Sequence, residues 1–276
     1  MEVTENGPVR ACVRIERKYL DSVIVQKIYL YHDIPRIDIK NIIDWKEHQI
    51  FVKDYFPVDV HTNEATFDIQ YGNVKRPTHA NTSWDFAKFE VCHHKWMDVS
   101  EEGYGVSFLN DCKFGVGVHG SEVGLSMLKS AIYPNPDADK EHHEFTYSIY
   151  PHAENWTDAD ANTVAQAYEL NNPMTAVVKE NEGGKLAGEY SLFKVDQNNV
   201  IIETVKKAEN GEDLIVRMYE CYNRRTNVVL TCGEKIADVT ECNLLEEEEQ
   251  PVSCTEHTVS FAIKPYEIKT LKIRRK

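Results

Sequence analysis

Apolar side chains at every second position are the feature that most constrains how this chain can fold. The segments 9–15, 67–71 and 145–149 each place apolar residues on one side and polar residues on the other. This two-residue period is typical of strands with one buried face. Clusters of Gly, Pro, Asn and Asp interrupt nearly every such segment, and these residues favour turns. The pattern predicts an all-β chain.

The C-terminal third repeats this signal at a density typical of a small β-sandwich. Its apolar segments are Tyr190–Val195, Val200–Val205, Leu214–Tyr222, Asn227–Thr231, Thr258–Ile263 and Ile268–Ile273. A polar, Gly-containing stretch, Glu180–Lys185, precedes them and suits a linker or a long hairpin. We therefore predict two domains, a larger one over residues 1–185 and a β-sandwich over residues 186–276.

One segment between these domains has helical spacing. Thr157 offers a hydroxyl N-cap with Asp160 three positions on, and Val164, Ala165 and Tyr168 follow at the spacing of one helix face. Pro173 lies beyond the expected end. The sequence predicts one helix of about three to four turns in an otherwise all-β chain.

Charge and cysteine content limit the function classes. The 31 Lys and Arg residues against 45 Asp and Glu residues give a net charge of −14. Such a chain repels nucleic acid and anionic lipid, so we expect neither as a partner. Seven scattered cysteines without a C-x-x-C pair favour free thiols in a reducing compartment. No signal peptide or membrane span is visible, and we expect a cytoplasmic protein.

A search for catalytic motifs finds no Gly-rich phosphate loop and no G-x-S-x-G elbow. The paired histidines His93-His94 and His142-His143 are better explained as ordinary imidazoles, because neighbours on a strand point to opposite faces and rarely bind one metal. Glycoside hydrolysis needs two carboxylates about 5–10 Å apart in a cleft. The sequence alone cannot select such a pair from 45 candidates.

Three polar clusters stand out, each with a structural interpretation beside a functional one. Phe56–Val60 holds Asp59, which could accept backbone hydrogen bonds at a bulge. Arg76–Asp85 could be a loop pinned by Asn and Thr side chains. Asn110–Gly115 could be a hairpin in which Gly115 supplies a positive φ.

Tryptophans add a second kind of candidate. Trp84, Trp96 and Trp156 could stack on sugar rings, because aromatic side chains are large and flat. Trp96 lies among alternating residues, so core packing is its expected role.

Longer phrases containing these clusters follow one another along the chain. They are Tyr29–Asp38, Phe56–Val60, Arg76–His79, Asn81–Asp85, Phe89–Cys92, Asn110–Gly115, Tyr133–Pro134, His143–Ser148 and Pro265–Leu271. In order and spacing they resemble the C-terminal half of glycoside hydrolase family 38 α-mannosidases of the bacterial and cytosolic type.

The resemblance implies a large β-supersandwich similar to galactose mutarotase, then a small β-sandwich. It also implies that the nucleophilic Asp and a divalent metal, usually zinc, lie in an N-terminal catalytic domain whose motifs this sequence lacks. We therefore expect no catalytic residue, metal ligand or cofactor in this chain. It would be a piece of a longer enzyme.

The family's large β-domain contributes side chains to the substrate cleft, which makes seven residues cleft candidates. They are His79, Trp84, Asn110, Asp111, Lys113, Lys129 and Tyr133. Lys129 stands where relatives usually carry Arg, and a Lys point charge does not replace a planar Arg fork.

The expected function is that of the non-catalytic portion of an α-mannosidase. In the full-length enzyme, which hydrolyses α-mannosides with retention, this portion would shape the cleft and support the catalytic domain. The expected partners are that domain, an α-mannoside or mannose oligosaccharide bound by the whole enzyme, and possible further copies in a homo-oligomer. An independent carbohydrate-binding module is the alternative, and an aldose-epimerase-like enzyme is a third reading that rests on fold analogy alone.

Overall fold

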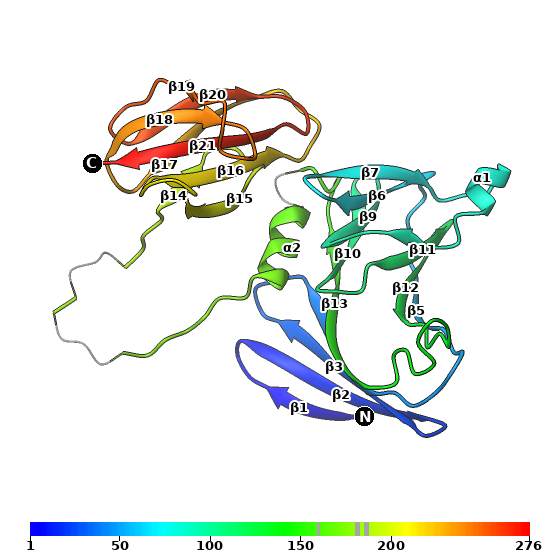
Figure 1. Cartoon of the computed structure of the whole chain (residues 1–276). Helices are drawn as coiled ribbons and strands as arrows, with labels where there is room; N and C mark the ends of the chain where they lie inside the picture. Colours follow the sequence, from blue (N-terminus) through cyan, green and yellow to red (C-terminus); the bar gives the residue numbers. More distant parts are fainter. Residues whose placement is uncertain (159–160, 180–182, 185–187) are drawn as a thin grey trace. The chain divides into compact units, whose positions relative to one another are not determined.

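The computed structural model describes residues 1–158, 161–179, 183–184 and 188–276. These residues form two compact units, Met1–Thr175 and Ala176–Lys276 (Figure 1). The domain boundary predicted at residue 185 lies outside the described residues. Each unit is a pair of antiparallel sheets, so the all-β prediction of a large supersandwich and a smaller sandwich is confirmed.

The first unit pairs a nine-stranded sheet with a four-stranded sheet. In spatial order, the larger sheet consists of β1 (Glu2–Asn6), β2 (Arg10–Tyr19), β3 (Ser22–Tyr31), β4 (Ile37–Asp44), β13 (His142–His152), β10 (Tyr104–Asn110), β9 (Trp96–Glu101), β6 (Glu64–Ile69) and β7 (Gly72–Pro77). The smaller sheet consists of β5 (Val52–Pro57), β12 (Glu122–Leu128), β11 (Gly115–His119) and β8 (Val91–Cys92).

One hydrophobic core lies between these two sheets. Ile43 of β4 and Phe108 of β10 belong to the same buried cluster as Val123 and Leu125 of β12. The alternation in the sequence explains this core, since every second side chain of each strand reaches it. Burying one such side chain contributes about 1.5–3 kcal/mol of stability.

Helix α2 (Thr163–Asn171) covers the other face of the nine-stranded sheet over β9 and β10. Thr163, Val164 and Ala167 are its buried residues. The Thr163 hydroxyl lies 2.8 Å from the Ser107 hydroxyl of β10. The sheet is therefore buried on both faces at this point.

Two buried carboxylates lie on the face that α2 covers. Asp98 of β9 lies 2.8 Å from His152 Nε2 and accepts a hydrogen bond of the same length from Ser107. Burial alone lowers the pKa of His152, but the hydrogen bond to Asp98 and its negative charge outweigh burial and raise that pKa. The second carboxylate, Asp38, accepts hydrogen bonds from Arg36 and Ser148.

The second unit pairs a three-stranded sheet with a five-stranded sheet. The first consists of β14 (Phe193–Val195), β17 (Thr226–Cys232) and β20 (Thr258–Ile263). The second consists of β15 (Val200–Lys207), β16 (Leu214–Glu220), β21 (Ile268–Arg275), β18 (Ile236–Cys242) and β19 (Gln250–Pro251). Val216, Leu230 and Leu271 belong to the core that both sheets share.

The predicted helix exists but starts later than expected. Asn162 is its N-cap, in a left-handed conformation and without a side-chain cap bond, and the helix has nine residues. Thr157 instead donates its hydroxyl hydrogen bond to Asn155 Oδ1 in a preceding turn. Asp160 lies outside the described residues. A second helix, the single turn α1 (Ser83–Phe86), lies in the segment that was interpreted as a loop pinned by Asn and Thr side chains.

The turn Asn110–Gly115 joins two strands, as predicted, but it is not a hairpin. It carries the chain from β10 in the larger sheet to β11 in the smaller one. Gly115 has no positive φ. A Cβ at this position would lie 3.0 Å from the Ser126 Cβ on the neighbouring strand, so close strand packing explains the glycine.

A substitution at Gly105 would show how tightly the Asp98–His152 pair is enclosed. A Cβ at Gly105 would lie 2.3 Å from His152 Cε1 and 2.6 Å from Ser100 Oγ. We expect Gly105→Ala to destabilise the fold by about 2 kcal/mol or more, because the buried ring has to move away from its carboxylate. Gly7→Ala is the control, since its nearest contact would be at 3.6 Å. Equal urea midpoints for the two variants would contradict this packing.

Candidate functional site

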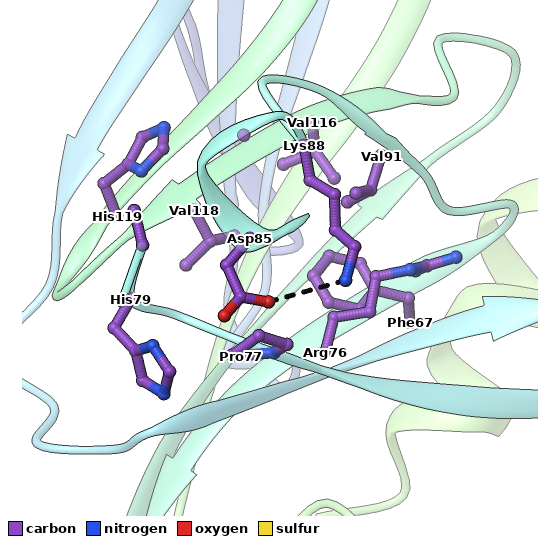
Figure 2. A pocket seen from close by; sticks show the side chains of 12 residues that line it. Phe67, Arg76, Pro77, His79, Asp85, Lys88, Val91, Val116, Val118 and His119 are labelled. Atoms are coloured by element: carbon purple, nitrogen blue, oxygen red, sulfur yellow. Dashed lines mark ion pairs between the residues drawn. The ribbon is translucent and has the colours of Figure 1, made fainter. Parts of the chain in front are cut away.

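A hollow lies where the edges of the two sheets of the first unit meet (Figure 2). Strand β7 contributes Arg76 to its wall, β11 contributes His119, and the α1 region contributes Asp85 and Lys88. Phe67 of β6 also lines it. Residues from three separate parts of the chain therefore form one polar recess.

Arg76 is held over an apolar surface in this recess. Its guanidinium carbon lies 4.7 Å from the centre of the Phe67 ring, and its Nη1 donates a hydrogen bond to the Cys92 carbonyl at 3.1 Å. Burial lowers the pKa of Arg76. No described carboxylate forms an ion pair with it.

Asp85 is the carboxylate of the recess, and the local fold already uses it. Thr82 donates a hydrogen bond to Asp85 Oδ2 at 2.7 Å and accepts one from the Asp85 amide at 3.1 Å, which caps α1. Lys88 Nζ lies 3.6 Å from Asp85 Oδ1 (Figure 2). The Thr82 hydrogen bond, with the charge of Lys88, lowers the pKa of Asp85. Asp85 is therefore ionised and holds the Thr82 cap in place, and it is not suited to donate a proton.

A second hollow adjoins the first and shares His79 and His119 with it. Its wall also contains Asp59, His61 and Glu101. Glu101 accepts a hydrogen bond from the His61 amide at 2.6 Å. No hydrogen bond to the Asp59 carboxylate is present among the described residues, so the predicted bulge contact is not seen. The two hollows offer imidazoles and cations to a polar ligand.

The predicted cleft residues fall into separate places. His79 lines both hollows, and the nearby Trp84 of α1 is 81% exposed. Lys113 lies close enough to Asp139 for its charge to affect that carboxylate. Asp139 also accepts a hydrogen bond from the Lys129 amide at 3.0 Å.

The loop that carries Lys129 and Tyr133 is fixed at one end and open at the other. Ser130 is fully buried and accepts a hydrogen bond from the Trp45 indole. Tyr133 is 86% exposed and precedes a cis peptide bond to Pro134. Its ring is therefore available to a ligand or to another part of a larger protein.

Asn110 and Asp111 are engaged in hydrogen bonds within the fold. Asn110 is buried, and its Nδ2 donates hydrogen bonds to His93 Nε2 at 2.9 Å and to the His94 carbonyl at 2.5 Å. Asp111 Oδ2 accepts a hydrogen bond from the Thr146 amide at 2.8 Å. Neither side chain lines either hollow.

Two tryptophans among the sugar-stacking candidates are not available to a ligand. Trp96 and Trp156 are both buried, and their ring centres lie 4.6 Å apart. The expected packing role of Trp96 is confirmed. Because Trp45 is buried as well, Trp84 is the one exposed tryptophan of the four.

In the described part of the chain, no three His, Cys, Asp or Glu side chains lie close enough together to hold a metal ion. These residues therefore do not fit a zinc ion, which the family resemblance assigns to the N-terminal catalytic domain. Neither described helix has the length and apolar character to cross a membrane.

Comparison with protein families identifies both units. A model described as the glycosyl hydrolases family 38 C-terminal domain matches residues 1–137. A second, described as the family 38 C-terminal beta sandwich domain, matches residues 199–271. This chain belongs to glycosyl hydrolase family 38. Its first unit holds the C-terminal domain match and its second unit holds the sandwich match.

Curated relatives of this family 38 chain are much longer than the chain itself. It is 34% identical to α-mannosidase G of Dictyostelium discoideum, with 98% of this chain and 26% of that protein aligned. It is 35% identical to human α-mannosidase 2C1, with 91% of this chain and 24% of that protein aligned. The chain thus spans about a quarter of the length of these relatives.

A solved structure shows the same fold. An α-mannosidase from Enterococcus faecalis superposes with a TM-score of 0.82 over 99% of this chain and 34% of its own chain. The sequence identity of the pair is 17%, so this likeness establishes the fold alone.

His93 is a buried group of this family 38 domain that sequence reasoning treated as ordinary. Its Nδ1 lies 3.1 Å from the Phe114 carbonyl and its Nε2 faces the Asn110 amide. Burial lowers the pKa of His93 to about 4, so the ring is neutral at physiological pH. The local signal in the sequence is only its position between the apolar pairs Val91-Cys92 and Trp96-Met97.

This neutral histidine predicts an acid-sensitive fold. Unfolded His has a pKa of about 6.5, so between about pH 6.5 and about pH 4 the unfolded chain binds a proton that the folded chain rejects. His93 therefore destabilises the fold as pH falls through this window, by about 2 kcal/mol between about pH 7 and about pH 5. Urea unfolding at both pH values should show this loss in the natural chain.

His93→Gln is the matched variant, because Gln can keep a donor and an acceptor in place. We expect the variant to be less stable at neutral pH but to lose about 2 kcal/mol less on acidification than the natural chain. The same pH dependence in both proteins would show that His93 is not the group responsible.

Proposed function

We propose that this chain is the C-terminal, non-catalytic part of a longer α-mannosidase that hydrolyses α-mannosides with retention of configuration. One observation carries the proposal. Both units match C-terminal domains of family 38, while the chain corresponds to about a quarter of proteins named α-mannosidase. The nucleophile and a divalent metal, zinc in this proposal, belong to the N-terminal remainder.

The chemistry of the described carboxylates supports this division of labour. A glycosidase acid needs a raised pKa so that it can hold a proton at neutral pH. In each described carboxylate whose pKa is shifted, including Asp85 and Asp139, the pKa is lowered. For Asp139, burial alone raises the pKa, but hydrogen bonds from the Ser130 and Lys129 amides outweigh burial. These groups are suited to hold loops in place.

In this proposal the exposed ends of the first unit complete the wall of the substrate cleft. His79, Lys129 and Tyr133 are the residues offered, because they lie at hollows or on an exposed loop. Asn110 and Asp111 act indirectly by holding the turn between the sheets. We also propose a cytoplasmic location, supported by seven cysteines that are all free.

An independent carbohydrate-binding module is the second candidate, and the exposure of Trp84 favours it. The three other tryptophans are buried, so a change in Trp fluorescence on adding a sugar would report mainly on Trp84. This property allows one sample to test both functions.

The isolated chain is expected to be inactive on an aryl α-mannoside, with or without added zinc. It is also expected to show no saturable change in Trp fluorescence with mannose oligosaccharides at about millimolar concentration, since weak sites bind in this range. The physical reasons are that the nucleophile belongs to the N-terminal remainder in this proposal, and that Asp85, the residue after Trp84, is already committed to Thr82 and Lys88.

Two results would contradict these expectations. Hydrolysis that copurifies with the chain and disappears on Asp85→Asn would place a catalytic centre in the recess. A saturable fluorescence change that Trp84→Ala abolishes would instead support the carbohydrate-binding module.

A further inference from the structure

The outward face of the four-stranded sheet has a floor of small residues. Gly115 and Gly117 of β11 and Gly124 and Ser126 of β12 form this floor, while the residues between them reach the core. A Cβ at Gly117 would lie 3.0 Å from the Phe89 carbonyl oxygen. The segment after α1 therefore rests directly on the floor.

A charged pair fixes this segment in place. Glu90 Oε2 accepts a hydrogen bond from Ser126 at 2.6 Å, and Glu90 Oε1 pairs with Lys53 of β5. The Lys53 side chain is largely buried. Its Nζ lies 5.4 Å from the centre of the Phe51 ring and 5.2 Å from the centre of the Tyr55 ring. Both charges are thus already satisfied within the fold.

Four exposed aromatic side chains come from the segments that carry this pair, and we call them the aromatic face: two lie beside Lys53, one precedes Glu90, and the fourth contacts that one. They are Phe51, Tyr55, Phe86 and Phe89. Phe86 and Phe89 are 65% and 64% exposed, although their rings are in edge contact at 5.7 Å. A shallow hollow beside Glu90 continues the surface to Lys129. Exposed aromatic side chains gathered on neighbouring segments in this way mark interaction sites.

The polar groups of the aromatic face distinguish a protein partner from a sugar. A sugar site needs free donors and acceptors for the hydroxyl groups of the ring. Here Lys53 and Glu90 are committed to each other and to Ser126, so few polar groups remain. The core of a protein interface, in contrast, is rich in aromatic residues and poor in free charge.

We propose that the aromatic face docks the N-terminal region of the longer family 38 protein, an inference that rests on the function proposed above. The occupant follows from the length of the relatives. About three quarters of each lies outside the matched region, and the matched domains are C-terminal ones. The partner must present an apolar surface with little charge, and Lys129 lies at the rim of the contact.

Chimeric enzymes test this docking. This chain replaces the matched region of human α-mannosidase 2C1 and, separately, of α-mannosidase G. The variant Phe86→Ser/Phe89→Ser should lower aryl α-mannosidase activity of the chimeras by at least about tenfold, because buried aromatic anchors dominate interface energy. In the isolated chain the same variant should leave the unfolding temperature unchanged, since both rings are exposed. Leu30→Ser, on the exposed surface of β3, is the control and should leave chimera activity unchanged.

The outcomes separate the docking face from the proposed function. Active chimeras that tolerate the double variant would overturn the docking face and leave the proposed function standing. Two inactive chimeras with the unmodified chain would overturn both. Self-association of the isolated chain that the double variant abolishes, with no effect in the chimeras, would assign the face to a second copy. Slower hydrogen exchange at the Phe89 amide when mannose oligosaccharides are added would assign the aromatic face to a sugar.

Discussion

Two carboxylates buried on the outward face of the nine-stranded sheet determine which side chains and which helix must cover that face. A buried charge is costly unless hydrogen bonds and a counter-charge satisfy it. Asp98 meets this need through His152 and Ser107, and Asp38 through Arg36 and Ser148. Helix α2 closes both sites, because Thr163 contacts Ser107 and Gln166 accepts a hydrogen bond from Arg36 at 3.0 Å. The helix thus seals one face of the sheet, while the smaller sheet covers the other.

The sequence predicted the strands better than their assembly. Alternation depends on local burial, so segments such as Phe145–Ile149 were readable as parts of strands. The turn at Asn110 was misread as a hairpin, because nothing local shows that the next strand joins a different sheet. The helix start was misplaced because Thr157 has a good capping side chain, yet a turn at Asn155 uses its hydroxyl. These errors share one cause, which is competition from tertiary contacts.

The same limit applies to the site. Sequence reasoning selected His79 and Trp84 because they lie in one polar phrase, and the structure places both near the recess. It could not add His119, which β11 contributes from forty residues away along the chain. Nor could it show that Asn110 is buried under His93, since burial is not a local property. The fold also presents two adjoining surfaces of different character, a polar recess at the sheet edges and an aromatic face on the smaller sheet.

If the N-terminal region docks on the aromatic face as proposed, it also shields the thiol of Cys92, and the reactivity of this thiol reports whether the face is covered. Cys92 is exposed on β8 of the same sheet, and Cys254, exposed in the second unit, provides an internal reference. The measurement is the rate of iodoacetamide labelling at both thiols, in the isolated chain and in an active chimera. We expect that joining the N-terminal region slows labelling of Cys92 at least about tenfold relative to Cys254. Equal labelling of Cys92 in both proteins would contradict it.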